Sequence, residues 1–302
     1  MKICFVAMNK RWGGLANNGG SKTIIRSADA LRKLGHAVQI AAVNDKHTWA
    51  KHPYALKEVP KNYDAYIACS VSDIDIVKNV KNKKYKFWWC RGFETWQMPE
   101  KKIIEKSEKI KTIVNSSWLL EKFPHAQLCY SGLDLEFWKY TGRSSDKLTI
   151  GGLWNGTHKT KRFDIFEAVM KKCGDRFNYK VLKDKYNDKE LLKFYNECDI
   201  WLATYELEGF HQVPAEAALC GNYIVCNSLN SNGMGDYATT KTAMRYAGFG
   251  ELISTLDAVQ TLSKNNGIPS LWEMGKDMRT LLETKIGNRE KNMKRFAKII
   301  GD

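Results

Sequence analysis

The start of the sequence reads as a strand, a glycine loop, a helix and a second strand, an order that restricts the chain to a small set of folds. Residues 3–8 are an apolar run, and Gly19-Gly20 closes the loop that follows. Apolar residues recur at helical spacing across residues 23–34, and residues 37–43 form a second apolar run. Because strands joined by a helix usually lie parallel in one sheet, this pattern predicts an α/β fold.

The second half repeats this succession around a loop that carries a carboxylate. Residues 198–204 form a short apolar strand pattern, Glu208-Gly209-Phe210 follows as a loop, and Gly221 would end the next helix. Glu208 is therefore expected in the loop and Glu216 inside the helix. Carboxylates accept hydrogen bonds from vicinal hydroxyls, and free N–H groups at a helix start attract an anionic group. A nucleotide-diphosphate sugar combines both features; the alternative is an ordinary loop glutamate followed by a helix-surface glutamate.

Length and composition suit two Rossmann-like halves. The chain has 302 residues, which fits two domains of about 150 residues each. Its hydrophobic content is 43%, no apolar stretch approaches the ~20 residues of a membrane span, and residues 2–8 are too short for a signal peptide. A cytoplasmic protein is expected. The 8 cysteines form no C-x-x-C pair and lie in apolar runs, which favours reduced core thiols over zinc ligands or disulfides.

The first glycine loop lacks two common nucleotide-binding motifs. Gly19-Gly20-Ser21-Lys22-Thr23 has no G-K-[ST] adjacency, and residues 13–20 contain no G-x-G-x-x-G. A kinase or a dehydrogenase is therefore disfavoured. Glycines before a helix still let the backbone approach a diphosphate closely.

The segment Glu208-Gly209-Phe210-His211-Gln212-Val213-Pro214-Ala215-Glu216, with Gly221 after it, resembles the signature of retaining GT-B glycosyltransferases of the family-4 type (glycosyl transferases group 1). The family pattern is close to EGFG-x-x-x-x-EA-x-x-x-G, and His211 stands in place of its usual glycine. Gly19-Gly20 and Gly35-His36-Ala37-Val38 are similar to the family's first loop and helix end, and residues 113–120, 130–138 and 148–154 are similar to later family segments. The resemblance touches nearly the whole chain, but only residues 206–221 are specific.

This resemblance implies a GT-B architecture of two Rossmann-like domains. Residues 1–145 would form the N-terminal domain on the acceptor side, and residues 146–287 the C-terminal domain that holds the sugar-nucleotide donor. Residues 288–302 would form a C-terminal helix that packs back on the first domain, with Phe296 and Ile300 among the apolar residues of one face. A simple amphipathic cap explains that pattern equally well.

The resemblance also implies a reaction in which the sugar leaves its nucleotide with retention of anomeric configuration, without a cofactor or a protein-bound metal. Glu208 would meet the transferred sugar as a catalytic residue. Phe210, His211 and Gln212 would lie beside it, and Glu216 would hold the ribose hydroxyls.

Gly19, Gly20 and Lys161 would face the diphosphate, because a cation beside the departing group stabilises its growing negative charge. Lys161 is preferred to Lys159, since Lys161-Arg162-Phe163-Asp164 resembles the family's K-G-x-D. The family's diphosphate arginine is replaced by Leu153 or Trp154. Arg162 is the candidate that would supply the missing catalytic charge.

Asp73-Ile74-Asp75 is a D-x-D, which binds a metal–nucleotide complex in the other major transferase fold. Here it enters a helix pattern, so N-capping and the helix dipole explain both carboxylates. No metal is expected.

The uneven charge suggests an anionic partner. The net charge is +15; residues 1–145 carry 25 Lys and Arg against 13 Asp and Glu, whereas residues 146–302 carry 23 against 20. Residues 78–111 combine many of these lysines with Trp88, Trp89, Trp96 and, at a strand end, Arg91. We expect these four residues on the acceptor side, and a membrane lipid, a glycan or DNA as the partner. The alternative is a buried strand at residues 87–90 with solvated lysines around it.

The expected function is therefore transfer of a sugar to an anionic acceptor. An envelope glycan or a lipid-linked glycan is the first choice, with the enzyme peripheral at an anionic membrane. A hydroxylated base in DNA is the alternative acceptor. A different class is also open, because the missing arginine and His211 would suit a non-catalytic sugar-nucleotide or glycan-binding protein. A sugar-nucleotide epimerase ranks lower, since those enzymes lack the E-G-F loop.

Overall fold

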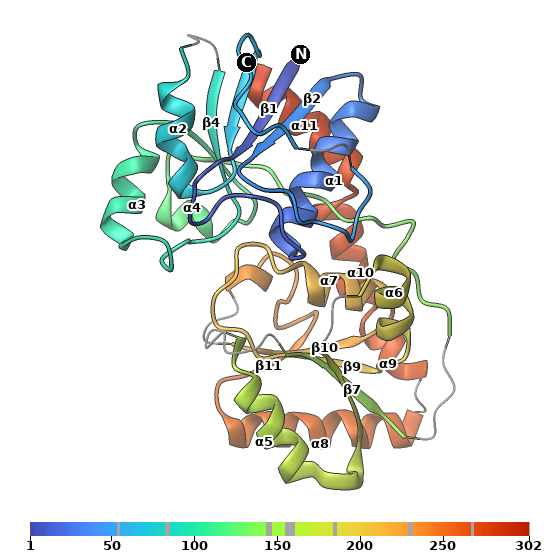
Figure 1. Cartoon of the computed structure of the whole chain (residues 1–302). Helices are drawn as coiled ribbons and strands as arrows, with labels where there is room; N and C mark the ends of the chain where they lie inside the picture. The colour runs from blue at the N-terminus through green and yellow to red at the C-terminus, as the bar shows by residue number, and fades with distance from the viewer. Residues whose placement is uncertain are drawn as a thin grey trace. The chain divides into compact units, whose positions relative to one another are not determined.

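The computed structural model describes residues 1–52, 55–81, 85–142, 147–154, 161–183, 186–228, 232–266 and 269–301. The chain divides into two compact units (Figure 1). Unit 1 comprises Met1–Gly132 together with Asn288–Asp302, and unit 2 comprises Leu133–Gly287. The boundary expected between residues 145 and 146 lies outside the described residues.

Unit 1 is built on a parallel sheet with the strand order β2-β1-β3-β4-β5-β6. Its elements are β1 Lys2–Ala7, α1 Gly19–Lys33, β2 Ala37–Ala42, β3 Ala65–Ala68, η1 Val71–Asp73, α2 Ile74–Asn79, β4 Tyr85–Cys90, α3 Glu100–Ser107, β5 Lys111–Val114, α4 Leu119–Lys122, β6 Gln127–Leu128 and α11 Arg289–Gly301. Figure 1 shows α1 and α11 on one side of this sheet, and α2 and α3 on the other.

The C-terminal helix α11 completes the core of unit 1. Met293, Phe296 and Ile300 belong to the same buried cluster as the strands β1 and β2 and the helix α1. The ring of Phe296 lies 6.2 Å from that of Phe5 and 5.4 Å from that of Trp89. The expected packing of this helix on the first half of the chain is confirmed.

Unit 2 is built on a second parallel sheet with the strand order β11-β10-β9-β7-β8. Its elements are β7 Thr149–Leu153, α5 Phe163–Cys173, η3 Gly174–Arg176, β8 Asn178–Leu182, α6 Asp188–Asn196, β9 Ile200–Ala203, α7 Gln212–Leu219, β10 Tyr223–Asn227, η4 Asn232–Met234, β11 Met244–Tyr246, α8 Phe249–Asn266, α9 Pro269–Met274, α10 Lys276–Leu281 and η5 Leu282–Ile286. Two parallel sheets of this kind confirm the expected α/β class with two Rossmann-like units.

Helix α7 ends where the sequence predicts. Gly221 follows the C-cap residue Cys220 and adopts φ +86°, a left-handed conformation that glycine reaches without a Cβ penalty. A Cβ at this position would stand 2.6 Å from Cδ2 of Tyr140 and 2.9 Å from Cδ1 of Trp272, so close packing also requires glycine.

The cysteines are free and buried, as the apolar runs predicted. Among the helices of the described ranges, none combines the length and the apolar character needed to cross a bilayer.

Candidate functional site

The strand order of unit 2 places a topological switch point at the carboxyl ends of β7 and β9. The chain leaves β7 for β8 on one side and returns to β9 on the other side of β7. Helices α5 and α7, which follow β7 and β9, therefore lie on opposite faces of the sheet (Figure 1). Their N-terminal ends flank the point where the connections diverge, which is where parallel α/β sheets bind ligands. Positive helix ends make such a point attractive to anions.

Lys161 and Glu208 meet at this switch point. Lys161 lies two residues before the start of α5, and Glu208 lies in the loop before α7. Nζ of Lys161 forms an ion pair with Oε1 of Glu208. The side chains are 17% and 26% exposed, so the pair is largely withdrawn from water. Thr204, just after β9, donates a hydrogen bond of 2.7 Å to the carbonyl of Lys161 and fixes its backbone. Lys159, the second candidate, lies outside the described residues.

Burial sets the electrostatics of this pair. Loss of solvation lowers the pKa of Lys161 to about 8. The ammonium is thus a cation that remains charged at neutral pH but is poorly hydrated. Such a group gains strongly from an anionic ligand.

Arg162, the next residue, has an unusual backbone conformation. Its guanidinium forms ion pairs with two carboxylates. Its φ is +46°, in the left-handed region that non-glycine residues seldom occupy, and it caps the start of α5. The guanidinium pairs with Asp164 at 2.9 Å and with Glu206. Arg162 therefore lies at the start of α5 beside Lys161, but Asp164 and Glu206 already offset its charge.

The segment that follows β10 forms hydrogen bonds to the loop from Glu208 to Gln212. The backbone N–H of His211 donates to the carbonyl of Gly233 at 2.9 Å, and the buried hydroxyl of Tyr237 donates to the carbonyl of His211 at 2.5 Å. A Cβ on Gly233 would lie 2.7 Å from Cβ of Glu208, so this position needs glycine. Phe210 is buried, and its ring lies 5.4 Å from that of Tyr237.

His211 and Tyr205 form an unsatisfied polar pair beside Lys161. Their rings lie edge to face at 4.1 Å, and Nζ of Lys161 lies 4.5 Å from the centre of the Tyr205 ring. Burial, with a further contribution from Lys161, holds the pKa of His211 well below its usual range, so its ring is neutral. Nε2 of His211 and the hydroxyl of Tyr205 are buried without a hydrogen-bond partner among the described residues. Buried polar atoms of this kind mark places where a ligand or water completes the hydrogen bonding.

Glu216 and Gln212 belong to α7. Gln212 is the first residue of the helix and is half-buried. Glu216 is buried and accepts a hydrogen bond of 3.3 Å from the hydroxyl of Tyr195 on α6. The helix-surface alternative for Glu216 is therefore wrong.

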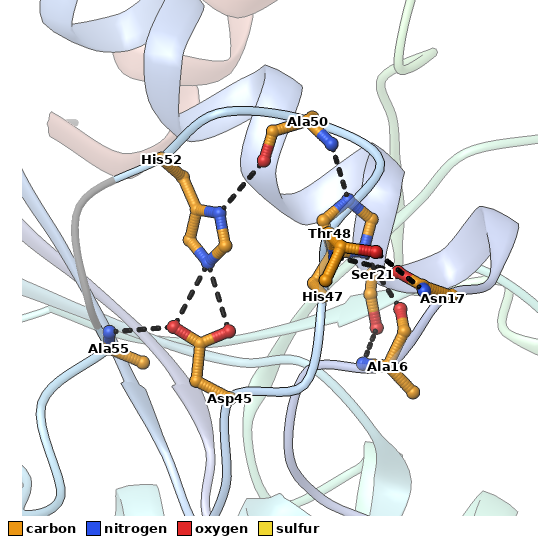
Figure 2. Close-up of polar contacts among 9 residues, drawn as sticks. All are labelled: Ala16, Asn17, Ser21, Asp45, His47, Thr48, Ala50, His52 and Ala55. Carbon is orange, nitrogen blue, oxygen red and sulfur yellow. Dashed lines mark hydrogen bonds and ion pairs between the residues drawn. The ribbon is translucent and has the colours of Figure 1, made fainter. Parts of the chain in front are cut away.

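In unit 1, Gly19 and Gly20 form the exposed first turn of α1. Figure 2 shows how the preceding loop is supported by the segment after β2. Nδ1 of His47 donates to the carbonyl of Ala16 at 2.8 Å, and the backbone N–H of Ala50 donates to Nε2 of the same ring at 3.1 Å (Figure 2). These bonds select the neutral ring, and burial lowers the pKa of His47 in the same sense. The histidine therefore acts as a structural brace for the glycine loop.

The predicted acceptor-side residues divide into two groups. Trp88 and Trp89 are fully buried in β4, so the buried-strand alternative is correct for these two side chains and their placement at an acceptor surface was wrong. Trp96, in the loop after β4, is 49% exposed. Arg91 donates to the carbonyls of Gly20 at 2.5 Å and Cys69 at 2.8 Å and thus joins the end of β4 to the glycine turn.

Asp73 of the D-x-D is buried, and it does not cap the helix it precedes. No side-chain cap bond is formed at the start of α2. Its carboxylate instead accepts backbone hydrogen bonds of 2.8 Å from Met8 and from Asn9, and one of 2.7 Å from the hydroxyl of Ser70. It thereby joins the loops after β1 and β3. The N-cap prediction was wrong for Asp73 because a buried carboxylate between two loops is offered more donors than one helix start supplies.

Asp75 forms an ion pair with Lys106, away from the donors that surround Asp73. Across the part of the chain that the structure describes, no group of three or more His, Cys, Asp and Glu residues has an arrangement that could hold a metal ion.

Several site features could not be identified from the sequence pattern. Tyr205 and Tyr237 contact the loop that carries Glu208, but neither belongs to the motif that singled out that loop. Glu94 is a buried carboxylate after β4 that accepts a hydrogen bond of 2.6 Å from the backbone N–H of Val71. The only sequence signal for Glu94 was its place one turn beyond an apolar strand, a position common to many loop residues.

Comparison with known proteins extends these observations. No protein-family model matches the sequence, and no curated protein matches it in a sequence search. Solved structures do match. A sucrose-phosphate synthase from Thermosynechococcus elongatus gives a TM-score of 0.73 over 99% of this chain and 98% of its own, at 12% identity. The Anabaena protein HepE, solved in complex with UDP and glucose, gives 0.74 over 100% and 99%, at 12% identity. A glycosyltransferase from Rickettsia africae gives 0.68 over 99% and 97%, at 11% identity. At these identities the likeness is one of fold, and the chain therefore has the GT-B fold, with two Rossmann-like units, in common with these structures.

Proposed function

We propose that the protein is a glycosyltransferase that moves a sugar from a nucleotide-diphosphate donor to an acceptor. The observation that carries this proposal is the Lys161–Glu208 pair, which places a poorly hydrated cation and a carboxylate between the N-terminal ends of α5 and α7. A diphosphate requires positive charge, and sugar hydroxyls require an acceptor such as a carboxylate. HepE, which shares the fold, has been solved with UDP-glucose, and this supports a donor of that kind.

In this proposal unit 2 binds the donor. The diphosphate would replace Glu208 as the partner of Lys161, and the backbone N–H groups of Gln212 and Val213 at the start of α7 would donate to it. Freed from the ion pair, Glu208 would accept hydrogen bonds from the sugar. His211 and Tyr205, with their unsatisfied polar atoms, would contact donor groups beside it.

The proposed reaction is a retaining substitution. The bond between the anomeric carbon and the diphosphate oxygen breaks, a bond to the acceptor oxygen forms on the same face, and the acceptor proton passes to the departing diphosphate. Lys161 stabilises the charge that develops on that diphosphate. Arg162, Gly19 and Gly20 keep their proposed diphosphate roles, although Arg162 must first exchange one of its carboxylates for phosphate. The proposal requires no metal and no cofactor.

Unit 1 is proposed to present the acceptor, with Arg91 and Trp96 as its contacts. The charge of +15 favours an anionic acceptor, and a glycan at an anionic membrane remains the first choice. A hydroxylated base in DNA is the second. Both proposals place the enzyme in the cytoplasm.

The test is donor turnover without acceptor. Purified protein is incubated with a panel of nucleoside-diphosphate sugars in EDTA, and thermal stabilisation and donor hydrolysis are followed together. We expect one donor to stabilise the protein and to be hydrolysed slowly, and both effects to be lost in Glu208→Ala. The exposed-pair variant Glu136→Ala is the matched control, because its partner Lys139 lies at the surface. Stabilisation without hydrolysis, even with acceptors added, would favour the non-catalytic binding protein, and no response to any donor contradicts the proposal.

A further inference from the structure

The amino-terminal edge of the unit 1 sheet carries a cavity lined by cations. This cavity has a volume of about 910 Å³, and it opens where the strands β1, β4 and β5 begin. Its lining residues include Lys78 at the end of α2, Lys109 after α3, and Lys111 at the start of β5. A second cavity of about 490 Å³ shares Lys111 and adds Arg295 and Lys298 of α11. We call these five residues, Lys78, Lys109, Lys111, Arg295 and Lys298, the basic track.

The cations of the basic track are not balanced by the protein. Within the described ranges, none of the five forms an ion pair with a carboxylate, although other surface cations of unit 1 do. Lys33 pairs with Asp29 and Lys122 pairs with Glu100, for example. Among the described residues that line the two cavities, Asp64 is the one that carries a carboxylate, and this carboxylate already accepts a hydrogen bond of 2.8 Å from the backbone N–H of Lys2. Unpaired like charges that share a surface repel each other, so an anion bound there gains free energy from all of them.

A structural role within the protein explains the position of the neighbouring Lys86, but no such role explains the exposed lysines of the basic track. Nζ of Lys86 donates to the carbonyls of Lys78 at 2.6 Å and Val80 at 2.7 Å, and it thereby satisfies the C-terminal end of α2. Lys111 extends over the rings of Tyr85 and Phe87, at 5.9 and 5.6 Å from their centres. The side chains of Lys78, Lys109 and Lys298 are exposed and have neither kind of contact.

The chemistry of the track selects the class of anion. A bilayer contact needs exposed aromatic or aliphatic side chains that enter the interface, and unpaired bases need an exposed aromatic platform. Met1 is the one exposed large apolar side chain among the described residues that line the two cavities. Lysine and arginine side chains without such neighbours suit a phosphate backbone, whose contacts hold a duplex without reading its bases.

We propose that the basic track docks the phosphodiester backbone of double-stranded nucleic acid. The track lies at the edge of the sheet opposite the glycine loop, because parallel strands begin at one edge and end at the other. Docking there is therefore independent of the proposed reaction and independent of base sequence. If the acceptor is DNA, the second choice of the proposed function, docking would also raise the local concentration of that acceptor without contacting the donor.

The test measures fluorescence anisotropy of a labelled duplex of about 20 base pairs, between about 50 and 300 mM KCl. The track variant carries Lys78→Gln, Lys109→Gln and Lys298→Gln. The control variant carries Lys171→Gln, Lys172→Gln and Lys189→Gln, which are exposed lysines of unit 2 and change the net charge equally. Wild-type binding is expected to weaken steeply with salt. The track variant is expected to bind roughly 100-fold more weakly at about 100 mM KCl and to have a shallower slope by about one unit per lysine, whereas the control keeps both values.

Three results would overturn the docking proposal. The first is an equal loss of duplex affinity in the track and control variants, and the second is a wild-type affinity that does not depend on salt. The third is binding to vesicles of anionic and neutral phospholipid that is stronger than duplex binding and that weakens in the track variant. Circular dichroism and donor hydrolysis are measured on the same samples. Because both should be unchanged in the track variant, failure of docking is distinguished from misfolding and from failure of the proposed transferase activity.

Discussion

The Lys161 ammonium is held where a cation loses most of its hydration, so its charge depends on pH within the range of an assay. Since burial lowers its pKa to about 8, the cation is present below pH 8 and is lost as the pH rises above that value. If this cation stabilises the departing diphosphate, donor hydrolysis should fall as the pH rises through 8. Lys161→Arg should remove that decline, because guanidinium stays charged, and Lys161→Met should lower the rate about 10²- to 10³-fold at every pH.

The matched control for this prediction is Lys180→Met, which breaks another lysine–glutamate pair of unit 2. The role of the Lys161 cation is tested by measuring the rate of donor hydrolysis between about pH 6.5 and 9.5, in steps of about half a unit. A wild-type rate that stays constant across this range contradicts the assigned role. The free energy of unfolding should instead rise with pH between pH 8 and about pH 10.5. In this range the lysine keeps its proton in the unfolded state but loses it in the folded state.

Glu94 offers a second prediction for a single residue. Burial raises its pKa to about 7 from an ordinary value near 4.5, so the folded state binds the proton more tightly than the unfolded state. The free energy of unfolding should therefore fall as the pH rises from 4.5 to 7, and Glu94→Gln should abolish this part of the pH dependence. Urea denaturation of wild type, Glu94→Gln and the exposed control Glu100→Gln at pH 5 and pH 8 measures the effect. Equal pH dependence in wild type and Glu94→Gln would contradict it.

The sequence could predict which residue types belong to the donor site but not the contacts between them. Glu208 and Lys161 are separated by 46 intervening positions, and only the strand order β9-β7 brings their loops together. For Trp88 and Trp89 the sequence could not predict even whether the side chains are buried. Their position among lysines is compatible with either a surface or a buried strand, and the decision depends on which side chains of α2, α4 and α11 cover the sheet, which sequence spacing does not encode.

At the scale of elements, the end of α7 depends on one glycine. Gly221→Ala would place a Cβ against Tyr140 and Trp272 and would impose a left-handed conformation on alanine. We expect a loss of about 2 to 4 kcal/mol in the stability of unit 2, from backbone strain and overpacking together. Gly248→Ala is the control, because no heavy atom lies within 4 Å of its Cβ position. Urea denaturation monitored by circular dichroism measures the loss; similar values for the two variants would contradict the packing argument.

Helix boundaries were predictable where an isolated local signal decides them, as with Gly221, and unpredictable where tertiary donors compete. Asp73 is the clearest case. Its position before an apolar helix pattern is that of an N-cap, yet its carboxylate turns to the loop after β1, which lies beside it only because β1 and β3 are neighbours in the sheet. Local sequence describes the helix, but the sheet order determines the partner.

At the scale of the whole molecule, helix α11 stabilises unit 1 although unit 2 separates the two in the sequence. Phe296→Ala would remove a ring packed between Phe5 and Trp89, and we expect a cost of about 3 to 5 kcal/mol. Hydrogen exchange monitored by mass spectrometry should then show faster exchange in β1 and β4 and unchanged exchange in β9 and β10, because the buried clusters of the two units share no residue. Lys294→Ala, an exposed position on the same helix, is the control. Uniform acceleration across both units would contradict the division into separate cores.

The path of the chain between the units has a consequence for synthesis. Leu133, where unit 2 begins, donates a hydrogen bond of 3.1 Å to the carbonyl of Gly287, where it ends, so unit 2 closes on itself before α11 is made. Unit 1 lacks Phe296 and Ile300 until α11 has left the ribosome. Unit 1, which begins before unit 2, is thus completed after it, and a nascent chain must keep the exposed core of unit 1 from aggregating while unit 2 folds.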